Sequence, residues 1–555
     1  MIIHRALWLV FFLFFSGHAV FLYFLIRRHL SPLAGRVVIG LTVAEAMLVG
    51  LHILTWGEMQ PFWAWLFSLN NELALGTMIA SAQYVAVGAT AALIAFFAPV
   101  LSGWRRAYWL FLAAFFIFFG LDEYFVIHEP IGEPLWVYLY AAMGALVVGL
   151  SLLAYRFGFR ENKRLFAMLL GGLAVMAFAG LGMDMFNLVV ACKPWVLGAE
   201  CERLWILEEY FEMAGVTLIW AGFISYAENA VTARRILTGA AAACGLWLLA
   251  LIGNLWLLPG LEARFGAAPV RVDYLDGELA LVGYRRSPET ASPGDAHHHT
   301  LYWRAGRFLE PDYSVSAHLL TQPDNGSVAQ SDVPLQADYV RAAVPTTAWL
   351  PGATIREELW LPIPEGITMP QSLRVMVRLR HPDRDTPITG TDRPMIGDDT
   401  AVLFDLPILG DAAIPEPPTR ANYRFQGDFV LDGYALPQTG SPGEALTARF
   451  WWRTGAPVAV DLQQYIHLFD SGGAFVATYD QPPFAGRFPT YDWPGGAAFV
   501  DEWEIPLPGD LPLGEYQICT GLYDPQSLVR QSVIDGEGQP IADNTICLGT
   551  ILVER

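Results

Sequence analysis

Eight long apolar runs constrain this sequence more than any other feature. Each is close to the roughly 20 residues that a helix needs to cross a hydrocarbon core of about 30 Å. In a bilayer such runs must be helical, because an unpaired backbone amide in lipid costs several kcal/mol. We therefore predict an α-helical polytopic membrane domain of eight transmembrane helices over residues 1–260, with the lipid bilayer as its partner. The runs occupy residues 6–26, 37–56, 78–100, 108–127, 135–155, 165–190, 204–226 and 236–258.

The basic residues of this half predict its orientation. The loops after the first, third, fifth and seventh runs hold 11 of its 14 lysines and arginines, and such residues collect on the cytoplasmic side of a membrane. The N-terminus is then outside, and an even number of spans places the C-terminal half outside as well. A short stretch at residues 61–69, with Trp63 and Trp65, is predicted to lie in the outer membrane interface.

Charge separates the two halves of the chain. The formal net charge is −20, yet residues 1–260 hold 14 basic and 15 acidic residues, so nearly all of the negative charge follows residue 260. An acidic surface repels phosphate backbones, which excludes nucleic acid as a partner. The oligomeric state stays open.

The cysteine positions agree with an exported C-terminal half. Cys192 and Cys201 flank the short loop between the sixth and seventh runs, Cys519 and Cys547 lie near the C-terminus, and Cys244 is alone in the eighth run. Both couples fall on the predicted oxidising side, where disulfides form and persist. We predict one disulfide within each couple.

After Pro259 the sequence changes to short alternating apolar stretches separated by Pro, Gly and Asp, a pattern typical of many short strands. These stretches recur at an offset that drifts from 150 to 144 residues, which indicates two copies of one fold. We predict two tandem all-β sandwich domains at residues 265–412 and 420–555 whose repeated tryptophans and tyrosines are core residues. The matches pair residues 281–284 with 431–434, 292–294 with 441–443, 302–304 with 451–453, 318–319 with 467–468, 349 with 493, and 361–364 with 505–508.

The second copy resembles a known module. Gly433-Tyr434, Ser441-Pro442-Gly443, Trp451-Trp452 and the segments 465–468, 489–495 and 514–524 look like the accessory β-sandwich domain at the C-termini of bacterial multi-pass glycosyltransferase-like membrane proteins. The resemblance covers most of residues 422–555 and, more weakly, 270–410. It implies a glycan-associated module on the extracytoplasmic side of a bacterial cytoplasmic-type membrane. The membrane half departs from that family, whose acidic catalytic residues follow the first helix, because the loop after residue 26 is short and basic.

A second pattern concerns carboxylates at the ends of apolar runs on the predicted outer side. Only Lys193 and Arg203 are nearby bases on that side. Charged groups at membrane depth cost at least a few kcal/mol, so this excess predicts raised pKa values or a bound cation. On helical spacing Asp122 shares a face with Glu129, as Tyr124 does with His128 and Glu208 with Glu212. The seven carboxylates are Asp122, Glu123, Glu129, Asp184, Glu208, Glu209 and Glu212.

The leading hypothesis is a metal-dependent hydrolase of a lipid-linked or envelope substrate. Carboxylate oxygens with one or two imidazoles favour Zn, Fe, Mn or Ca, and Glu123 or Glu209 would act as general base. The segment 121–129 also resembles a Leu-Asp-Glu and His-Glu helix of uncharacterised bacterial membrane proteins, which implies no activity. The predicted metal ligands are Asp122, His128, Glu129, Asp184, Glu208 and Glu212. The residues predicted to surround and orient these ligands without binding the metal are Glu45, His52 and Tyr124.

Two other classes of function are open. One is a non-catalytic surface anchor whose sandwiches bind glycan or a protein partner. The other is an ion or proton conduit centred on Glu45, a lone carboxylate in the middle of the second run. His18 is predicted to be a hydrogen-bonded interior residue. The segment 297–299, three histidines, is predicted to be surface-exposed, because zinc needs three or four converging ligands and only two of these share a strand face.

Overall fold

The computed structural model describes the whole chain except residues 1–16, 19, 27, 56–60, 70, 72, 100, 102, 128–130, 132–134, 184–201, 231–232, 288–290, 311, 335–343, 382 and 411–413. The chain forms two compact units. One comprises residues 1–267 with 302–313 and 335–357, and the other comprises residues 268–301 with 314–334 and 358–555.

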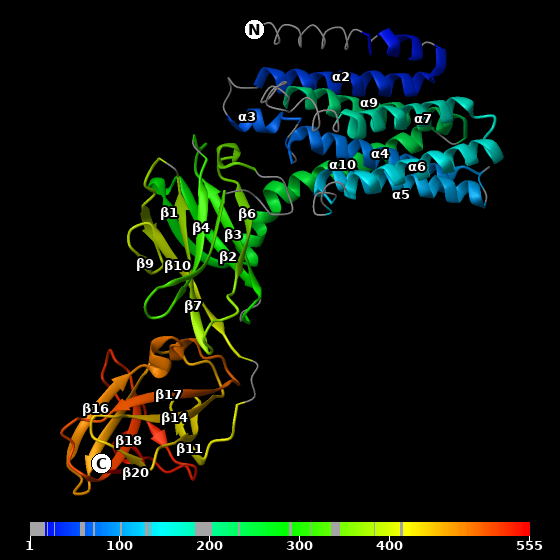
Figure 1. Cartoon of the computed structure of the whole chain (residues 1–555). Coiled ribbons are helices and arrows are strands. Elements are labelled where there is room, and N and C mark those ends of the chain that lie inside the picture. Colours follow the sequence, from blue (N-terminus) through cyan, green and yellow to red (C-terminus); the bar gives the residue numbers. More distant parts are fainter. Residues whose placement is uncertain are drawn as a thin grey trace. The chain divides into compact units, whose positions relative to one another are not determined.

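The N-terminal half is helical, as predicted (Figure 1). Within the described residues, six helical segments are long and apolar enough to cross a membrane. A seventh helix, α9 (Glu202–Ala230), covers the seventh predicted run, and the first run is helical at residues 17, 18 and 20–26. The number of eight spans stays a prediction. The six segments lie in α2 (Pro32–Thr55), α4 (Leu75–Phe97), α5 (Trp104–Phe125), α6 (Leu135–Phe157), α7 (Lys163–Ala177) continued by the π-helix η2 (Phe178–Met183), and α10 (Ala233–Ile252) continued by η5 (Gly253–Leu257) and α11 (Leu258–Phe265).

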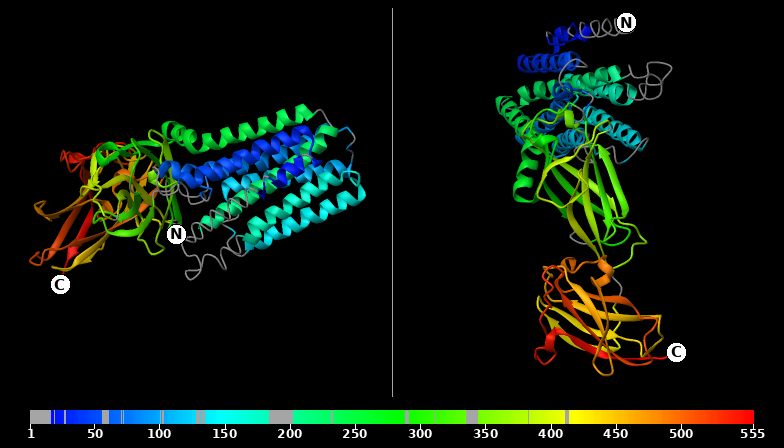
Figure 2. Two further views of the ribbon diagram at one scale, coloured as in Figure 1. Left: turned by 90° about the horizontal axis from the view of Figure 1, so that it is seen from above. Right: turned by 90° about the vertical axis from the view of Figure 1, so that its left-hand side faces the viewer.

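Glycines bring two helix pairs into close contact. A Cβ atom on Gly88 of α4 would lie 2.9 Å from the Ala113 carbonyl oxygen of α5, and one on Gly172 of α7 would lie 2.6 Å from the Gly215 carbonyl oxygen of α9. Small residues let membrane helices pack backbone to backbone. These helices run alongside one another in the bundle (Figure 2). The short helix α3 (Pro61–Leu66) forms where the interfacial segment is predicted.

The end of α5 corrects one spacing argument. This helix stops at Phe125, and Val126 takes the left-handed conformation with φ 51°. Pro130 has no N–H to donate to the Val126 carbonyl, and its ring would clash there, so a helix through this point is disfavoured. Helical spacing therefore does not place Glu129 on the face of Asp122, nor His128 on that of Tyr124. His128 and Glu129 themselves lie outside the described residues.

The C-terminal half is all-β, as predicted, and its first ten strands form two five-stranded sheets. Their orders are β6-β3-β2-β1-β8 and β5-β4-β7-β10-β9. The strands are β1 (Ala268–Tyr274), β2 (Leu279–Ser287), β3 (Ala296–Ala305), β4 (Ser314–Thr321), β5 (Ser327–Pro334), β6 (Thr354–Pro362), β7 (Gln371–Arg380), β8 (Ile388–Thr391), β9 (Met395–Ile396) and β10 (Thr400–Ile408).

The next ten strands repeat this plan. Their sheets have the orders β17-β14-β12-β11-β19 and β13-β20-β18-β15-β16, and both contribute to one apolar core. Among the described residues, the small edge strands next to β10 and β20 differ, since β9 is antiparallel to β10 and β13 is parallel to β20. At the position of β13, the first copy has an isolated parallel bridge from Ala291 to Ile408. The strands are β11 (Thr419–Phe425), β12 (Phe429–Ala435), β13 (Thr439–Gly440), β14 (Ala445–Thr454), β15 (Gln463–Asp470), β16 (Phe475–Gln481), β17 (Ala498–Pro506), β18 (Gly514–Tyr523), β19 (Val533–Ile534) and β20 (Ile546–Val553).

Matched tryptophans are core residues in both copies. Trp349 and Trp493 each follow a short 3-10 turn, η7 (Thr346–Ala348) and η9 (Thr490–Asp492). Each indole N–H donates to a backbone carbonyl five residues earlier, at 2.9 Å and 3.1 Å respectively. Both side chains are fully buried. The same local structure at a spacing of 144 residues supports the sequence repeat.

The prediction for the three histidines of β3 is wrong. His297 and His299 are buried, and His297 Nδ1 lies 3.1 Å from His299 Nε2. His298, on the other strand face, pairs with Glu358. The reason is strand alternation, since Leu446 and Ala448 at the matching positions of the second copy are also buried. Burial, together with the neighbouring histidines and Arg286, lowers the pKa of His299 to about 3.

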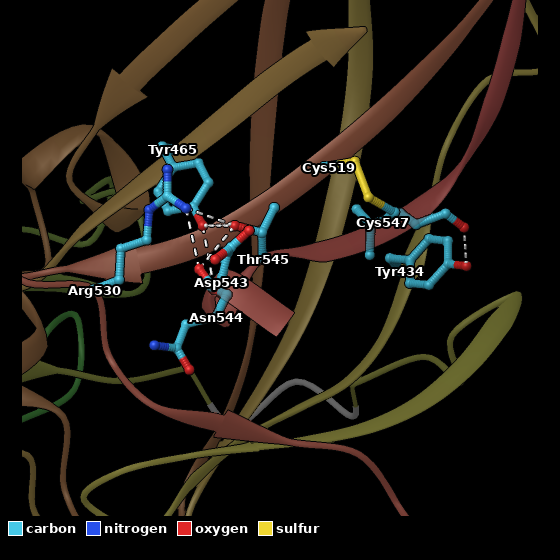
Figure 3. The surroundings of a disulfide bond; sticks show 9 residues. Tyr434, Tyr465, Cys519, Arg530, Asp543, Asn544, Thr545 and Cys547 are labelled. Carbon is cyan, nitrogen blue, oxygen red and sulfur yellow. Dashed lines mark hydrogen bonds between the residues drawn. A yellow bond between two sulfur atoms is a disulfide. The ribbon is translucent and has the colours of Figure 1, made fainter. Parts of the chain in front are cut away.

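The disulfide predicted for the C-terminal couple is present. Cys519 of β18 and Cys547 of β20 are opposed in register and joined. Figure 3 shows them beside Tyr434, and further along the same sheet Arg530 lies over the ring of Tyr465, 4.8 Å from its centroid. Cys192 and Cys201 lie outside the described residues, and Cys244 is a half-buried free thiol.

Candidate functional site

Five of the predicted carboxylates line one cavity among the helices. Its volume is about 380 Å³. The described lining comes from α5 and α9, from α4, α6 and α7, and from η2. The five carboxylates are Asp122, Glu123, Glu208, Glu209 and Glu212, and the other two, Glu129 and Asp184, lie outside the described residues. The convergence expected from the sequence is thus present for the described carboxylates.

The last turn of α5 and the N-terminal half of α9 position these carboxylates. Asp122 and Glu123 occupy the last turn of α5, while Glu208 and Glu212 are four residues apart and share one face of α9. The C-terminal end of a helix carries the negative pole of its dipole, so the α5 carboxylates sit in an unfavourable field. Asp122 is buried, and the other four are partly exposed to the cavity. The arrangement concentrates negative charge and favours a positively charged occupant.

A glycine in the π-helical turn makes room for one of these groups. A Cβ atom on Gly180 of η2 would lie only 2.5 Å from Glu212 Oε1. The Glu212 carboxylate therefore packs against the bare backbone of η2. Single π-helical turns are rare and occur frequently at functional sites.

Aromatic side chains that were not predicted from the sequence form another part of the cavity wall. Tyr84 of α4 is buried and lies within electrostatic range of four of the carboxylates. Tyr140 of α6 stands next to Asp122, and Trp136 precedes it by one helical turn. A signal was present, because tyrosine inside an apolar run needs a polar partner for its hydroxyl. The cavity is thus lined by both carboxylates and aromatic rings.

The lining has a one-sided charge. No lysine, arginine or histidine is among its described residues. Within the part of the chain that the structure describes, no three His, Cys, Asp or Glu side chains are close enough together to hold a metal ion. Carboxylate oxygens suit a hard divalent cation. The described carboxylates therefore supply the donor type for a metal but not a complete ligand set, and His128, Glu129 and Asp184 lie outside the described residues.

The three residues predicted to orient the ligands make three different sets of contacts. His52 is buried, and its Nδ1 accepts the backbone N–H of Leu69 at 3.0 Å, so it holds a residue that lines the cavity. Tyr124 faces away from the cavity, and its hydroxyl donates to the Leu251 carbonyl of α10 at 3.3 Å. Glu45 is absent from the described lining and belongs to another polar cluster.

That second cluster joins three helices in the middle of the bundle. Glu45 Oε1 accepts hydrogen bonds from Gln83 Nε2 of α4 at 3.0 Å and from Thr217 Oγ1 of α9 at 2.6 Å. Nearby, His18 hydrogen bonds to the hydroxyl of Tyr210, as expected for an interior histidine. Gln83 and Thr217 were not singled out from the sequence.

Comparison with known proteins gives a family match and several distant structural matches. A family described as "Domain of unknown function (DUF8692)" matches residues 37–227, less than half of the chain. No curated protein matches. Among solved structures, the C-terminal domain of wzt is 15% identical with a TM-score of 0.19, covering 25% of this chain and 83% of that one. Bacteroides uniformis beta-glucuronidase 2 covalently bound to cyclophellitol-6-carboxylate aziridine is 12% identical with a TM-score of 0.16, covering 42% of this chain and 26% of that one. The chain thus spans about a quarter of the length of this glucuronidase.

Proposed function

We propose that this protein is a membrane hydrolase whose acidic cavity binds a divalent metal ion next to a lipid-linked or envelope substrate. The observation that supports this proposal most is the convergence of five carboxylates in one cavity with no described basic residue in its lining. Negative charge among apolar helices costs at least a few kcal/mol. A divalent cation offsets that cost and uses the oxygen ligands that the cavity offers.

The proposal gives each group a role. At most two of the described carboxylates, Asp122 and Glu212, hold the ion in this proposal. Glu208 adds negative charge beside it, and His128, Glu129 and Asp184 would complete the ligand set. A bound Zn, Fe or Mn ion would lower the pKa of a water molecule, and Ca would supply charge and orientation. Glu123 or Glu209 would be the general base of the hydrolysis. The rings of Trp136 and Tyr140 offer an apolar wall for the lipid part of a substrate.

Metal analysis of the purified full-length protein tests the proposal. We expect one equivalent of a divalent metal per chain, bound at least tenfold more weakly after Glu212→Gln or Asp122→Asn, because each change removes a charged oxygen ligand. Glu228→Gln is the matched control, since Glu228 lies on α9 but not in the described lining. A wild-type protein that holds no metal contradicts the proposal, as does metal binding that survives both cavity changes.

A second measurement separates binding from catalysis. Glu123→Gln and Glu209→Gln should be tested for hydrolysis of lipid extracts from the host envelope. We expect one of them to keep its metal and lose turnover by a factor of 10² to 10⁴, the usual contribution of a general base. Turnover that is unchanged in both variants would remove the general base from the proposal.

An aromatic strip on the second sandwich supports glycan binding as a further candidate function. The rings of His467, Phe469 and Phe475 lie next to one another on one face of β15 and β16, with centroids 5.4 Å to 6.1 Å apart. Phe475 is exposed, and Asp480 is opposite Tyr465. Rings stack on the apolar faces of sugars while neighbouring polar groups bind hydroxyls. We propose that this strip binds an envelope polysaccharide.

The repeat provides the control for this candidate. His318 occupies the position of His467 in the first copy, where Ser316 and Leu320 replace the neighbouring rings. On an array of purified bacterial envelope polysaccharides, the full-length protein should bind, His467→Ala should lose at least tenfold in affinity, and His318→Ala should bind like the wild type. Equal loss from both changes, or no binding by the wild type, would argue against the strip.

A further inference from the structure

The carboxyl group of Glu45 lies at the crossing of three helices. The side chain is 0% exposed and sits in the middle of α2. Its Oε1 atom accepts one hydrogen bond from Gln83 of α4 and one from Thr217 of α9. One oxygen of this carboxyl group therefore ties α2 to both neighbouring helices.

The other oxygen and its neighbour present a conflict. Within the described residues, Glu45 Oε2 and Gln83 Oε1 are both buried and neither has a hydrogen-bond partner. The NH₂ group of Gln83 donates to Glu45 Oε1. The two oxygens without a partner are therefore the remaining polar atoms of two side chains that already contact each other. An ionised carboxylate and an amide carbonyl can only accept hydrogen bonds. With Glu45 ionised, two buried acceptors keep their full desolvation cost.

We propose that Glu45 is a proton-binding site: it carries a proton on Oε2 and donates it to Gln83 Oε1, which makes a neutral carboxylic acid–amide pair. Gln83 Nε2 donates to Glu45 Oε1 and the Glu45 hydroxyl donates back to Gln83. A single proton thereby satisfies both oxygens and removes the net charge from an apolar region. Thr217 keeps its hydrogen bond to Oε1, which has a second lone pair.

The number of oxygens favours a proton over a metal ion. Among the described residues, the buried oxygens that this cluster leaves without a partner are Glu45 Oε2 and Gln83 Oε1. Hard metal cations in proteins take about six or more oxygen ligands. A proton needs one donor atom and one acceptor atom, and the pair supplies both.

The titratable neighbours can be named from each packed element. From α9, Tyr210 lies within electrostatic range of Glu45, and from the segment 17–26, His18 hydrogen bonds to Tyr210. On α4, Tyr84 follows Gln83 and lines the acidic cavity, and on α2 itself His52 lies seven residues beyond Glu45 and bonds to Leu69. None of the hydrogen bonds to Glu45 comes from a cation.

The protonated pair holds α2 against α4, so this helix contact depends on the proton. Loss of the proton would break the hydrogen bond from Glu45 to Gln83 and leave a charge in the apolar core, which weakens the contact of α2 with α4. This inference is independent of the proposed hydrolase, since Glu45 is absent from the described lining of the acidic cavity.

Infrared spectroscopy of the full-length protein in lipid nanodiscs tests the proposal. At pH 7 we expect a protonated-carboxyl carbonyl band that shifts in D₂O and is lost in Glu45→Gln. Gln83→Leu should shift the band, because the acceptor of the proton is gone. Asp122→Asn is the control and should leave it in place. Glu45→Gln should keep the wild-type melting temperature, since a Gln–Gln pair retains both hydrogen bonds.

Several outcomes would overturn it. One is the absence of a protonated-carboxyl band in the wild type, and another is a band that persists in full in Glu45→Gln. A band that sodium ions remove at constant pH would show that a metal cation competes for the pair and would replace the proton by that ion. If Glu45→Gln fails to fold, an unshifted band in Gln83→Leu contradicts the proposed pair on its own.

Discussion

Ionisable side chains in this protein are buried or half-buried at positions where the surrounding structure makes room for them. Glu212 fits because Gly180 has no Cβ. His299 is neutral at ordinary pH because it faces a sandwich core. Asp501 of β17 is 0% exposed, and the spacing of 144 residues places Glu357, also buried, at the same position of the first copy. At the residue scale, each such group makes stability or binding sensitive to a single change.

Gly180→Ala should displace the Glu212 carboxylate. The new Cβ would need the place of an atom 2.5 Å away, and such overpacking costs about 1–3 kcal/mol. We expect weaker metal binding than in the wild type with a largely retained fold, measured by metal analysis and thermal unfolding. Gly171→Ala on α7 is the matched control, because its Cβ would meet only Leu218 at 3.6 Å. Equal metal affinity in the two variants would contradict the role given to Gly180.

Asp501 should make the second sandwich less stable as the pH rises. Burial, opposed by hydrogen bonds from Phe484 and Trp503, raises the pKa of Asp501 from 3.8 to about 6. The native state therefore holds a proton that the unfolded chain releases. The stabilisation is complete below about pH 4 and is lost as the pH passes through 6.

The size of this effect can be measured. This rise in the pKa of Asp501 corresponds to on the order of 3 kcal/mol in the free energy of unfolding. Denaturant unfolding of the full chain between pH 4 and 7, followed by near-UV circular dichroism, should show the decline in the wild type and a flatter profile in Asp501→Asn. Identical profiles would mean that Asp501 ionises freely in the native state.

At the scale of elements, the interruptions of regular structure have local causes. The helix α5 ends at Phe125, where Val126 takes the left-handed conformation, whereas α7 runs on into the π-helical η2 beside α9. Both interruptions border the acidic cavity. In the sandwiches, the same short 3-10 turn precedes Trp349 and Trp493. The conformation of this loop is therefore repeated in the two copies, as the strands are.

The disulfide between β18 and β20 should stabilise the second copy selectively. It closes a loop with a sequence separation of 28 residues, for which loop entropy predicts about 3–4 kcal/mol. In a Cys519→Ala/Cys547→Ala variant, we expect the second sandwich to unfold at lower denaturant while the first copy unfolds as before. Site-resolved hydrogen exchange distinguishes the two, and Cys244→Ala is the control. Parallel loss of protection in both copies would show that the sandwiches unfold together.

At the scale of the whole molecule, the long apolar helices are compatible with a membrane protein. The side on which the sandwiches lie is a prediction from the basic loops. The loop between α6 and α7 holds Arg160 and Glu161, Lys163 begins α7, and this end of the helices is predicted to be cytoplasmic.

Cysteine labelling in intact cells tests this orientation. In a Cys244→Ala background, Glu537→Cys in the second sandwich should react with an impermeant maleimide, and Glu161→Cys in the α6–α7 loop should not. Both positions are exposed in the structure, so their difference reports the membrane side. Labelling of the loop alone would reverse the predicted orientation.

The sequence by itself determined the helical half, the repeated β half and the C-terminal disulfide, because apolar run length, strand alternation and an ordered repeat are local or periodic properties. It also predicted that carboxylates at the ends of spans gather on one side, and the five described ones line one cavity. Only the tertiary structure decided which aromatic groups join them, that Gly180 admits Glu212, and that Glu45 meets Gln83 and Thr217 rather than the cavity. These contacts depend on which helices are neighbours and how they are rotated, which distant packing fixes and local sequence patterns do not encode.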